Sequence, residues 1–199
     1  MPSKARQTSI SDSQLQRVIY SLWDFQQALS AVSFITNEFD FNGEYGTHEI
    51  RRYRSFEANF IISMARPLEQ TRGGTTLSFK AVGMKLTARE KQLCKDVLEL
   101  RRKVIAHSAE EEMHFRVQTH ELSEVGEGLD GLNVPLFRFN EWLLCSEDEL
   151  LELELFLGRL IQGLGKFLYK LAQSEPDRLN KYKEPDSGRH KRDGGDGAR

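Results

Sequence analysis

The chain has 199 residues, of which 39% are hydrophobic and 29% charged, a composition typical of a soluble globular protein of one domain. Its formal net charge of −2 gives no overall field that attracts nucleic acid or an anionic membrane, so any basic site must be local. The N-terminus lacks the apolar stretch of a signal peptide, and no uncharged apolar run of about 18 residues predicts a membrane span. These features predict a cytoplasmic protein.

Two stripes of apolar residues at helical spacing occupy the first third of the chain. Ser11 and Gln14 form a capping-box pattern at the start of the first stripe, and Pro67 stops the second. The first consists of Leu15, Val18, Leu22, Phe25, Leu29 and Val32, and the second of Tyr53, Phe56, Phe60 and Met64. Each stripe predicts one amphipathic helix.

Two further stripes follow a long connection, residues 68–86, which indicates either a functional loop or predicted helix boundaries that are too short. Thr87 with Glu90, and Ser146 with Glu149, form capping boxes at the two helix starts. The third stripe is Leu93, Val97, Leu100, Val104 and His107, and the fourth is Leu153, Leu157, Leu160, Leu164, Phe167 and Leu171.

Four amphipathic helices must bury their stripes against one another, which predicts an all-α protein, an antiparallel four-helix up-and-down bundle. Between the third and fourth helices, residues 113–119 alternate apolar and polar, and 133–142 are rich in aromatics. These two segments predict a β-hairpin-like insertion, about 113–142, with Pro135 on an edge strand.

The ends of the chain are expected to lie outside the bundle. Residues 1–10 are predicted to be flexible, and the helical domain to span 11–174. Residues 175–199 contain almost no apolar side chains, which predicts a disordered tail whose removal leaves thermal stability nearly unchanged.

The segment 99–112, ELRRKVIAHSAEEE, carries the residues best suited to chemistry. His107 continues the apolar stripe of the third helix, and a histidine in that position is more often a core residue than a catalytic one. At about 100° per residue, Arg101 and Arg102 lie roughly 120° and 140° from His107 on a regular helix, so neither shares its face. Glu99 and Lys103 are spaced for an ordinary i,i+4 surface pair.

The stretch LRRKVIAHS, residues 100–108, resembles the motif of the HEPN superfamily, most closely its abortive-infection branch. That motif is an arginine, usually a polar residue after it, and a histidine after four to six intervening residues near the end of the third helix. The resemblance covers about residues 11–172 as architecture and nine residues as motif. Both Arg101 and Arg102 fit the spacing; the flanking residues favour Arg101, although another arginine follows it where Asn, Asp or His is common.

The resemblance implies a metal-independent endoribonuclease site, composed across a homodimer interface, with Arg101 or Arg102 and His107 as catalytic residues. Imidazole can accept a proton from an attacking 2′-hydroxyl or donate one to the leaving oxygen at neutral pH. Guanidinium supplies fixed positive charge to the phosphorane-like transition state. An RNA substrate, an antitoxin or another protein partner, and a role as a toxin or antiphage effector follow from the same resemblance.

Other residues are weaker candidates. Arg51, Arg52 and Arg54 alternate with aromatics, which suits binding of an RNA backbone, although a solvated face is slightly favoured. Arg72, beside Gly73 and Gly74, is a further candidate for phosphate. The two cysteines are expected to be free thiols, and no pattern predicts a metal site or a cofactor.

Two other function classes stay open beside the ribonuclease. A catalytically silent HEPN-like module would bind RNA, a nucleotide or a protein partner. A purely structural helical dimer would use His107 only for packing.

Overall fold

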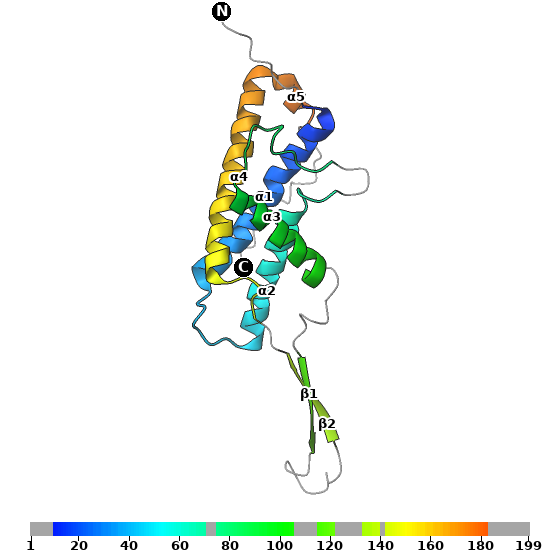
Figure 1. The fold of residues 1–199 in the computed structure, drawn as a ribbon, viewed down its shortest axis with the longest axis vertical. Helices are drawn as coiled ribbons and strands as arrows, with labels where there is room; N and C mark the ends of the chain where they lie inside the picture. Colours follow the sequence, from blue (N-terminus) through cyan, green and yellow to red (C-terminus); the bar gives the residue numbers. More distant parts are fainter. Residues whose placement is uncertain (1–9, 71–74, 106–114, 122–132, 140–141, 183–199) are drawn as a thin grey trace, which may run out of the picture.

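The computed structural model describes residues 10–70, 75–105, 115–121, 133–139 and 142–182. Most of these residues are helical, as expected for the all-α class (Figure 1). The helices are α1 (Asp12–Glu38), α2 (Thr47–Ala65), α3 (Ala88–Leu100), the π-helical turn η1 (Arg101–Ile105), α4 (Glu147–Ser174) and α5 (Pro176–Asn180). Within this part of the chain, none of the helices has the length and apolar character needed to cross a membrane.

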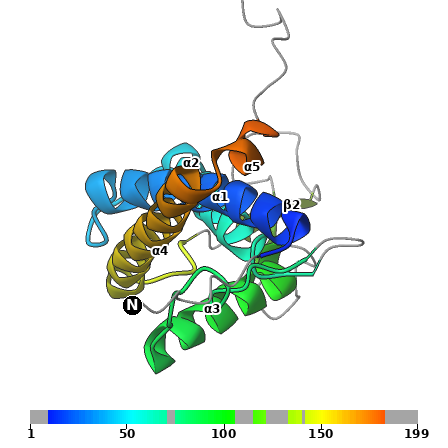
Figure 2. The ribbon, with the colours of Figure 1, turned by 90° about the horizontal axis from the view of Figure 1, so that it is seen from above.

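The long helix α1 packs against both α2 and α4, and α3 packs against α2. Figure 1 shows α1 and α4 side by side and running in opposite directions, with α2 returning beside α1. Seen from above in Figure 2, α3 lies outside these helices and crosses them obliquely. The end of α3 therefore lies on the surface, next to the end of α2.

The capping residues read from the sequence set the helix starts. Thr87 and Glu90 bind each other's backbone N–H groups at α3, and Ser146 and Glu149 do the same at α4, so two of the three predicted capping boxes are confirmed. At α1 only half of the predicted box forms: the Ser11 hydroxyl accepts the N–H of Gln14 at 3.2 Å, but the side-chain oxygen of Gln14 has no hydrogen-bond partner among the described residues. Helix α2 begins at Thr47, six residues before its stripe.

Buried side chains of the four stripes form one core. Leu157, Leu160 and Leu164 of α4 are fully buried, as are Leu15 and Phe25 of α1. Burial of each such side chain contributes about 1.5–3 kcal/mol relative to exposure.

The second stripe differs from its prediction in one place. Phe56 is only partly buried and stacks on Phe34, whereas Glu57 is 1% exposed in the core. The buried residues of α2 therefore include a stripe of Tyr53, Glu57, Phe60 and Met64, which keeps a helical spacing of three and four.

Two strands lie between η1 and α4 in the chain. β1 (Phe115–Glu121) pairs antiparallel with β2 (Asn133–Phe139), and Pro135 lies opposite Thr119. The pair extends away from the helices in Figure 1. The rest of the segment 113–142, apart from Trp142, lies outside the described residues.

The connection after α2 contains turns but no regular helix in its described part. Leu77 and Val82 are buried in the core, and the Leu77 N–H donates to the carbonyl of Pro67 at 2.8 Å. Gly83 has a φ of 72°, a backbone conformation that glycine adopts without strain. The buried side chains of Leu77 and Val82 hold this segment, residues 75–86, against the helices.

Residues 175–182 differ from the predicted tail, because they form α5 and contact the start of α1. The Arg178 guanidinium binds the Ile10 carbonyl and the carboxylates of Asp12 and Glu175. The Tyr182 hydroxyl donates to the Asp12 carbonyl at 3.2 Å. Composition did not predict this segment because its contacts with the start of α1 are mainly polar and join residues more than 160 positions apart in sequence.

Truncation after Ser174 is therefore expected to lower the melting temperature by a few degrees, because it removes the contacts of Arg178 and Tyr182 with α1. Truncation after Tyr182 keeps these contacts and is the control. Differential scanning calorimetry of both proteins measures the effect. Equal melting temperatures would show that α5 adds nothing to the stability of the helices.

Candidate arginine site at the end of α3

Helix α3 leads into the motif arginines and is held by its own cap and three core residues. The Thr87 capping box fixes its first turn, and Leu93, Cys94 and Val97 are buried. Arg101 and Arg102 follow the last residue of the regular helix. The capping box and the buried residues thus fix the position of α3, and with it the point at which Arg101 and Arg102 follow the helix.

At Arg101 the helix changes from α to π geometry, and η1 runs from Arg101 to Ile105. Short π-helical turns are uncommon and occur frequently at functional sites. The angles of roughly 120° and 140° assumed a regular α-helix of about 100° per residue, so they do not apply through η1.

Glu69, just after α2, binds both motif arginines. Arg101 Nη1 contacts Glu69 Oε2, and Arg102 Nε lies 3.4 Å from Glu69 Oε1. The Glu69 side chain is 16% exposed, and its N–H donates to the Ala65 carbonyl at 3.1 Å. The carboxylate is therefore fixed at the end of α2 and draws both guanidinium groups to one place.

The two arginines differ in exposure. The Arg101 side chain is 35% exposed and the Arg102 side chain 67%. A guanidinium has five donors, so an arginine bound to a carboxylate on one edge keeps donors for a phosphate on another. Arg101 is the more firmly positioned of the two and Arg102 the more accessible.

Two of the predicted site residues, His107 and Arg72, lie outside the described residues. The neighbouring prediction for Glu99 and Lys103 is confirmed: Lys103 Nζ lies 2.6 Å from Glu99 Oε1. The hydrogen bond from Lys103 lowers the pKa of the Glu99 carboxyl.

The arginines near the start of α2 have acidic neighbours. Arg52 binds Glu38 at 2.5 Å, and its guanidinium carbon lies 5.5 Å from the centre of the Tyr53 ring. Arg54 binds the buried Glu57 at 2.6 Å. Arg52 and Arg54 therefore each use some of their donors in an ion pair within the protein. Arg51 is exposed, and it too is not free of contacts with other residues.

Glu57 is the ionisable residue that the sequence patterns missed. Its Oε1 accepts the N–H of Leu144 at 2.6 Å and that of Cys145 at 2.9 Å, just before α4 begins. Burial raises the pKa of this carboxyl, although the two N–H groups and Arg54 act in the opposite direction. The sequence contained one signal for it: Glu57 comes four residues after Tyr53 and therefore lies on the same, buried face of α2. Its role is to hold the start of α4 on α2.

Neither cysteine is suited to be a nucleophile. Cys94 and Cys145 are free and buried, as expected. Burial raises the pKa of the Cys94 thiol to about 12 and also raises that of Cys145. Across the described ranges, no group of three or more His, Cys, Asp or Glu side chains is placed to hold a metal ion.

Comparison with protein-family models, with curated proteins and with solved structures finds no match to this chain.

Proposed function

We propose that the protein is a HEPN-like, metal-independent endoribonuclease. The proposed architecture is a four-helix up-and-down bundle with a hairpin inserted between α3 and α4. The antiparallel packing of α1 with α4, and the position of the motif at the end of α3, support it.

One observation carries the proposal: Glu69 gathers Arg101 and Arg102 where α3 becomes π-helical. The proposed site consists of these arginines and His107, which comes two residues after η1 in the chain. A second copy of the chain completes the site, so the active form is a homodimer.

In the proposed reaction, the 2′-oxygen of a ribose attacks the adjacent phosphorus. A bond from phosphorus to this oxygen forms, and the bond to the 5′-oxygen of the next nucleotide breaks. His107 of one protomer accepts the 2′-hydroxyl proton, and its counterpart in the second protomer donates a proton to the leaving oxygen. Arg101, held by Glu69, stabilises the negative charge that develops on the phosphate. The products are a 2′,3′-cyclic phosphate and a 5′-hydroxyl.

Glu69 also supports a second candidate, the catalytically silent module. Its carboxylate occupies donors of both arginines, which a phosphate would otherwise use. Such a module would bind RNA, a nucleotide or a protein partner, an antitoxin included, without cleaving RNA.

The test is incubation of the purified full-length protein with single-stranded RNA in excess chelator. The proposal expects fragments that end in cyclic phosphate and begin with 5′-hydroxyl, from a protein with the mass of a dimer by light scattering. A strict monomer at micromolar concentration would contradict the composite site. Failure to cleave RNA both with and without added metal would leave the silent module as the function.

A further inference from the structure

Lysines are distributed unevenly over the part of the molecule that the structure describes. Six of the eight lysines that the structure describes line two adjoining hollows and are exposed. We call them the lysine surface: Lys80, Lys85, Lys91, Lys95, Lys166 and Lys170. None of the six forms an ion pair with another described residue, whereas Lys103 pairs with Glu99 and Lys181 with Asp12.

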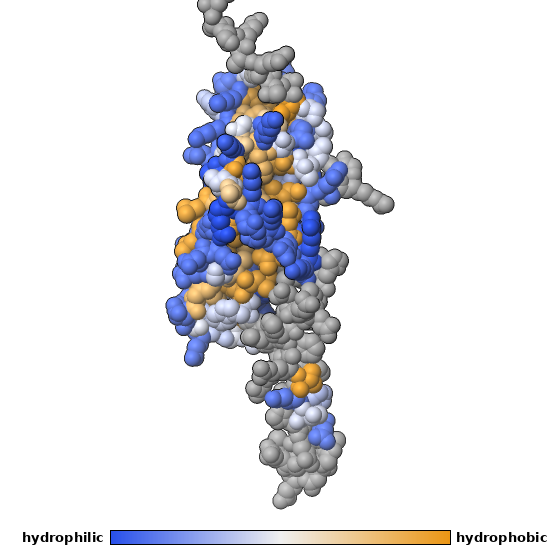
Figure 3. All heavy atoms as spheres, in the orientation of Figure 1, coloured by the Kyte–Doolittle hydropathy of each residue, from blue (hydrophilic) through white to orange (hydrophobic). Residues whose placement is uncertain are grey.

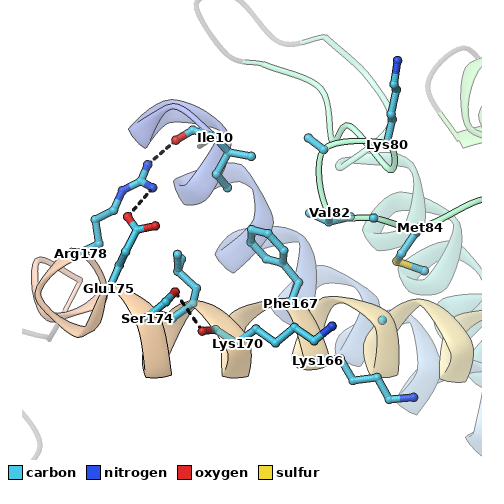
Figure 4. Close-up of a pocket in the computed structure, with 14 residues that line it drawn as sticks. Ile10, Lys80, Val82, Met84, Lys166, Phe167, Lys170, Ser174, Glu175 and Arg178 are labelled. Atoms are coloured by element: carbon cyan, nitrogen blue, oxygen red, sulfur yellow. Dashed lines mark hydrogen bonds and ion pairs between the residues drawn. The ribbon is translucent and has the colours of Figure 1, made fainter. Parts of the chain in front are cut away.

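The first hollow lies between the segment 80–84 and the second half of α4 and has a volume of about 450 Å³. Figure 4 shows the Phe167 side chain of α4 lying between Ile10 and Val82. Lys166 and Lys170 come from the same helix. At the far end, Arg178 is paired with Glu175. The hollow thus has an apolar floor with lysines around it.

The second hollow lies between the same segment and the first half of α3 and has a volume of about 740 Å³. Phe79 and Leu86 contribute apolar surface, and Lys85, Lys91 and Lys95 contribute charge. The two hollows share Lys80, Gly83 and Met84. Both volumes are in the range of ligand-binding clefts, about 300–1,000 Å³.

The lysine surface continues along α3 toward the arginine site. Lys91, Lys95 and Leu98 follow one another in steps of four and three, which places them on one face of α3. With a rise of about 1.5 Å per residue, Lys91 and Leu98 are separated by roughly 10 Å along the helix. The second hollow is therefore continued by this face toward the end of α3, where Arg101 and Arg102 follow in η1.

We propose that the lysine surface binds the backbone of single-stranded RNA and leads it along α3 to Arg101 and Arg102. The last part of this path rests on the proposed function. In a chain of net charge −2, six lysines without acidic partners among the described residues repel one another, and a polyanion relieves that repulsion. Phe79 and Phe167 lie where bases can stack between the charged side chains.

An anionic membrane surface fits these residues less well. Figure 3 shows strongly hydrophilic side chains standing around apolar surface on the face that it presents. Phe79 and Phe167 are partly buried in the walls of hollows, whereas insertion into a membrane requires apolar side chains that project. The concave surface is better suited to a strand than to a lipid layer.

The experiment compares two double variants that lose the same charge. Lys91→Gln with Lys95→Gln removes two lysines of the surface, and Arg66→Gln with Lys181→Gln removes two cations outside both hollows. Each change is made in the His107→Ala background and measured in chelator by fluorescence anisotropy with labelled single-stranded RNA, so that the RNA stays intact. Each phosphate contact adds about 0.7 to the slope of log affinity against log salt concentration. We therefore expect the loss of two contacts to weaken RNA binding by the lysine variant roughly 25-fold at about 0.1 M salt, and the control variant to bind like its parent.

Equal affinity of the lysine variant and its parent, or equal weakening of both double variants, would overturn the inference. Binding to phosphatidylserine vesicles without binding to RNA would overturn it in favour of a membrane. The two proposals fail separately. Lysine-dependent RNA binding by a wild type that never cleaves RNA supports the surface and rejects the ribonuclease. If the wild type cleaves RNA and the lysine substitutions change neither cleavage nor binding, the ribonuclease is supported and the lysine surface is rejected.

Discussion

Replacing His107 with alanine is expected to lower the rate of RNA cleavage by a factor of about 10² to 10⁴, because it removes the group proposed to transfer protons. The change should leave the melting temperature and the dimer mass close to those of the parent. Initial rates of cleavage of a labelled RNA in chelator, measured with enzyme in excess, report the chemical step.

His48→Ala is the matched control, because His48 is an exposed histidine in the first turn of α2. It should cleave RNA at the parental rate. If His107 were instead a core residue, its replacement would lower the melting temperature, and the parent would have no cleavage to lose. A folded His107→Ala protein with parental cleavage would reject the assigned role.

Separate replacement of Arg101 and Arg102 by alanine shows which arginine stabilises the phosphate. We expect the larger loss of cleavage for Arg101, which Glu69 positions and the flanking motif residues favour. Glu69→Gln is the control for the ion pair, since it weakens the same contact but keeps both guanidinium groups. If Arg101→Ala and Glu69→Gln reduced cleavage equally, the arginine would act only through its ion pair.

The helix starts could be predicted from sequence because their causes are local. A capping box is a contact between residues three positions apart, as for Thr87 with Glu90, and the pattern of the sequence contains it in full. The leucine stripe of α4 is also local, since its spacing alone places the residues on one face. Periodicity did not identify Arg101 and Arg102, which come directly after α3; they were identified by the resemblance of residues 100–108 to the HEPN motif.

The features that could not be predicted depend on partners far away in the chain. Glu57 is stable in the core because it binds N–H groups 87 and 88 residues later. Glu69 meets Arg101 across 32 residues. The uneven distribution of lysines becomes visible only when α3 and α4 lie on either side of the segment 79–86. Periodicity describes one element at a time and contains none of these contacts.

Glu57→Ala is expected to lower the free energy of unfolding by about 3 kcal/mol, because it leaves the N–H groups of Leu144 and Cys145 without their acceptor and Arg54 without its partner. For a protein of this size the melting temperature should fall by roughly 6–12 °C. Glu152→Ala removes an exposed carboxylate bound to Arg89 and should change the melting temperature little. Similar melting temperatures for the two variants would show that Glu57 does not anchor α4.

The pH dependence of stability tests the ionisation of Glu57 by itself. Burial raises the pKa of Glu57 above its ordinary value of 4.5, so between that value and the folded pKa the native protein binds more protons than the unfolded chain. The free energy of unfolding contributed by Glu57 therefore falls as pH rises through this window and is constant above it. Glu57→Gln keeps an oxygen acceptor for the two N–H groups and cannot ionise. Urea titrations at about pH 5 and about pH 7 should show a smaller loss of stability with rising pH in Glu57→Gln than in the parent. An identical loss in both proteins would mean that the Glu57 carboxyl is ionised throughout, with the Arg54 guanidinium and the two N–H groups outweighing its burial.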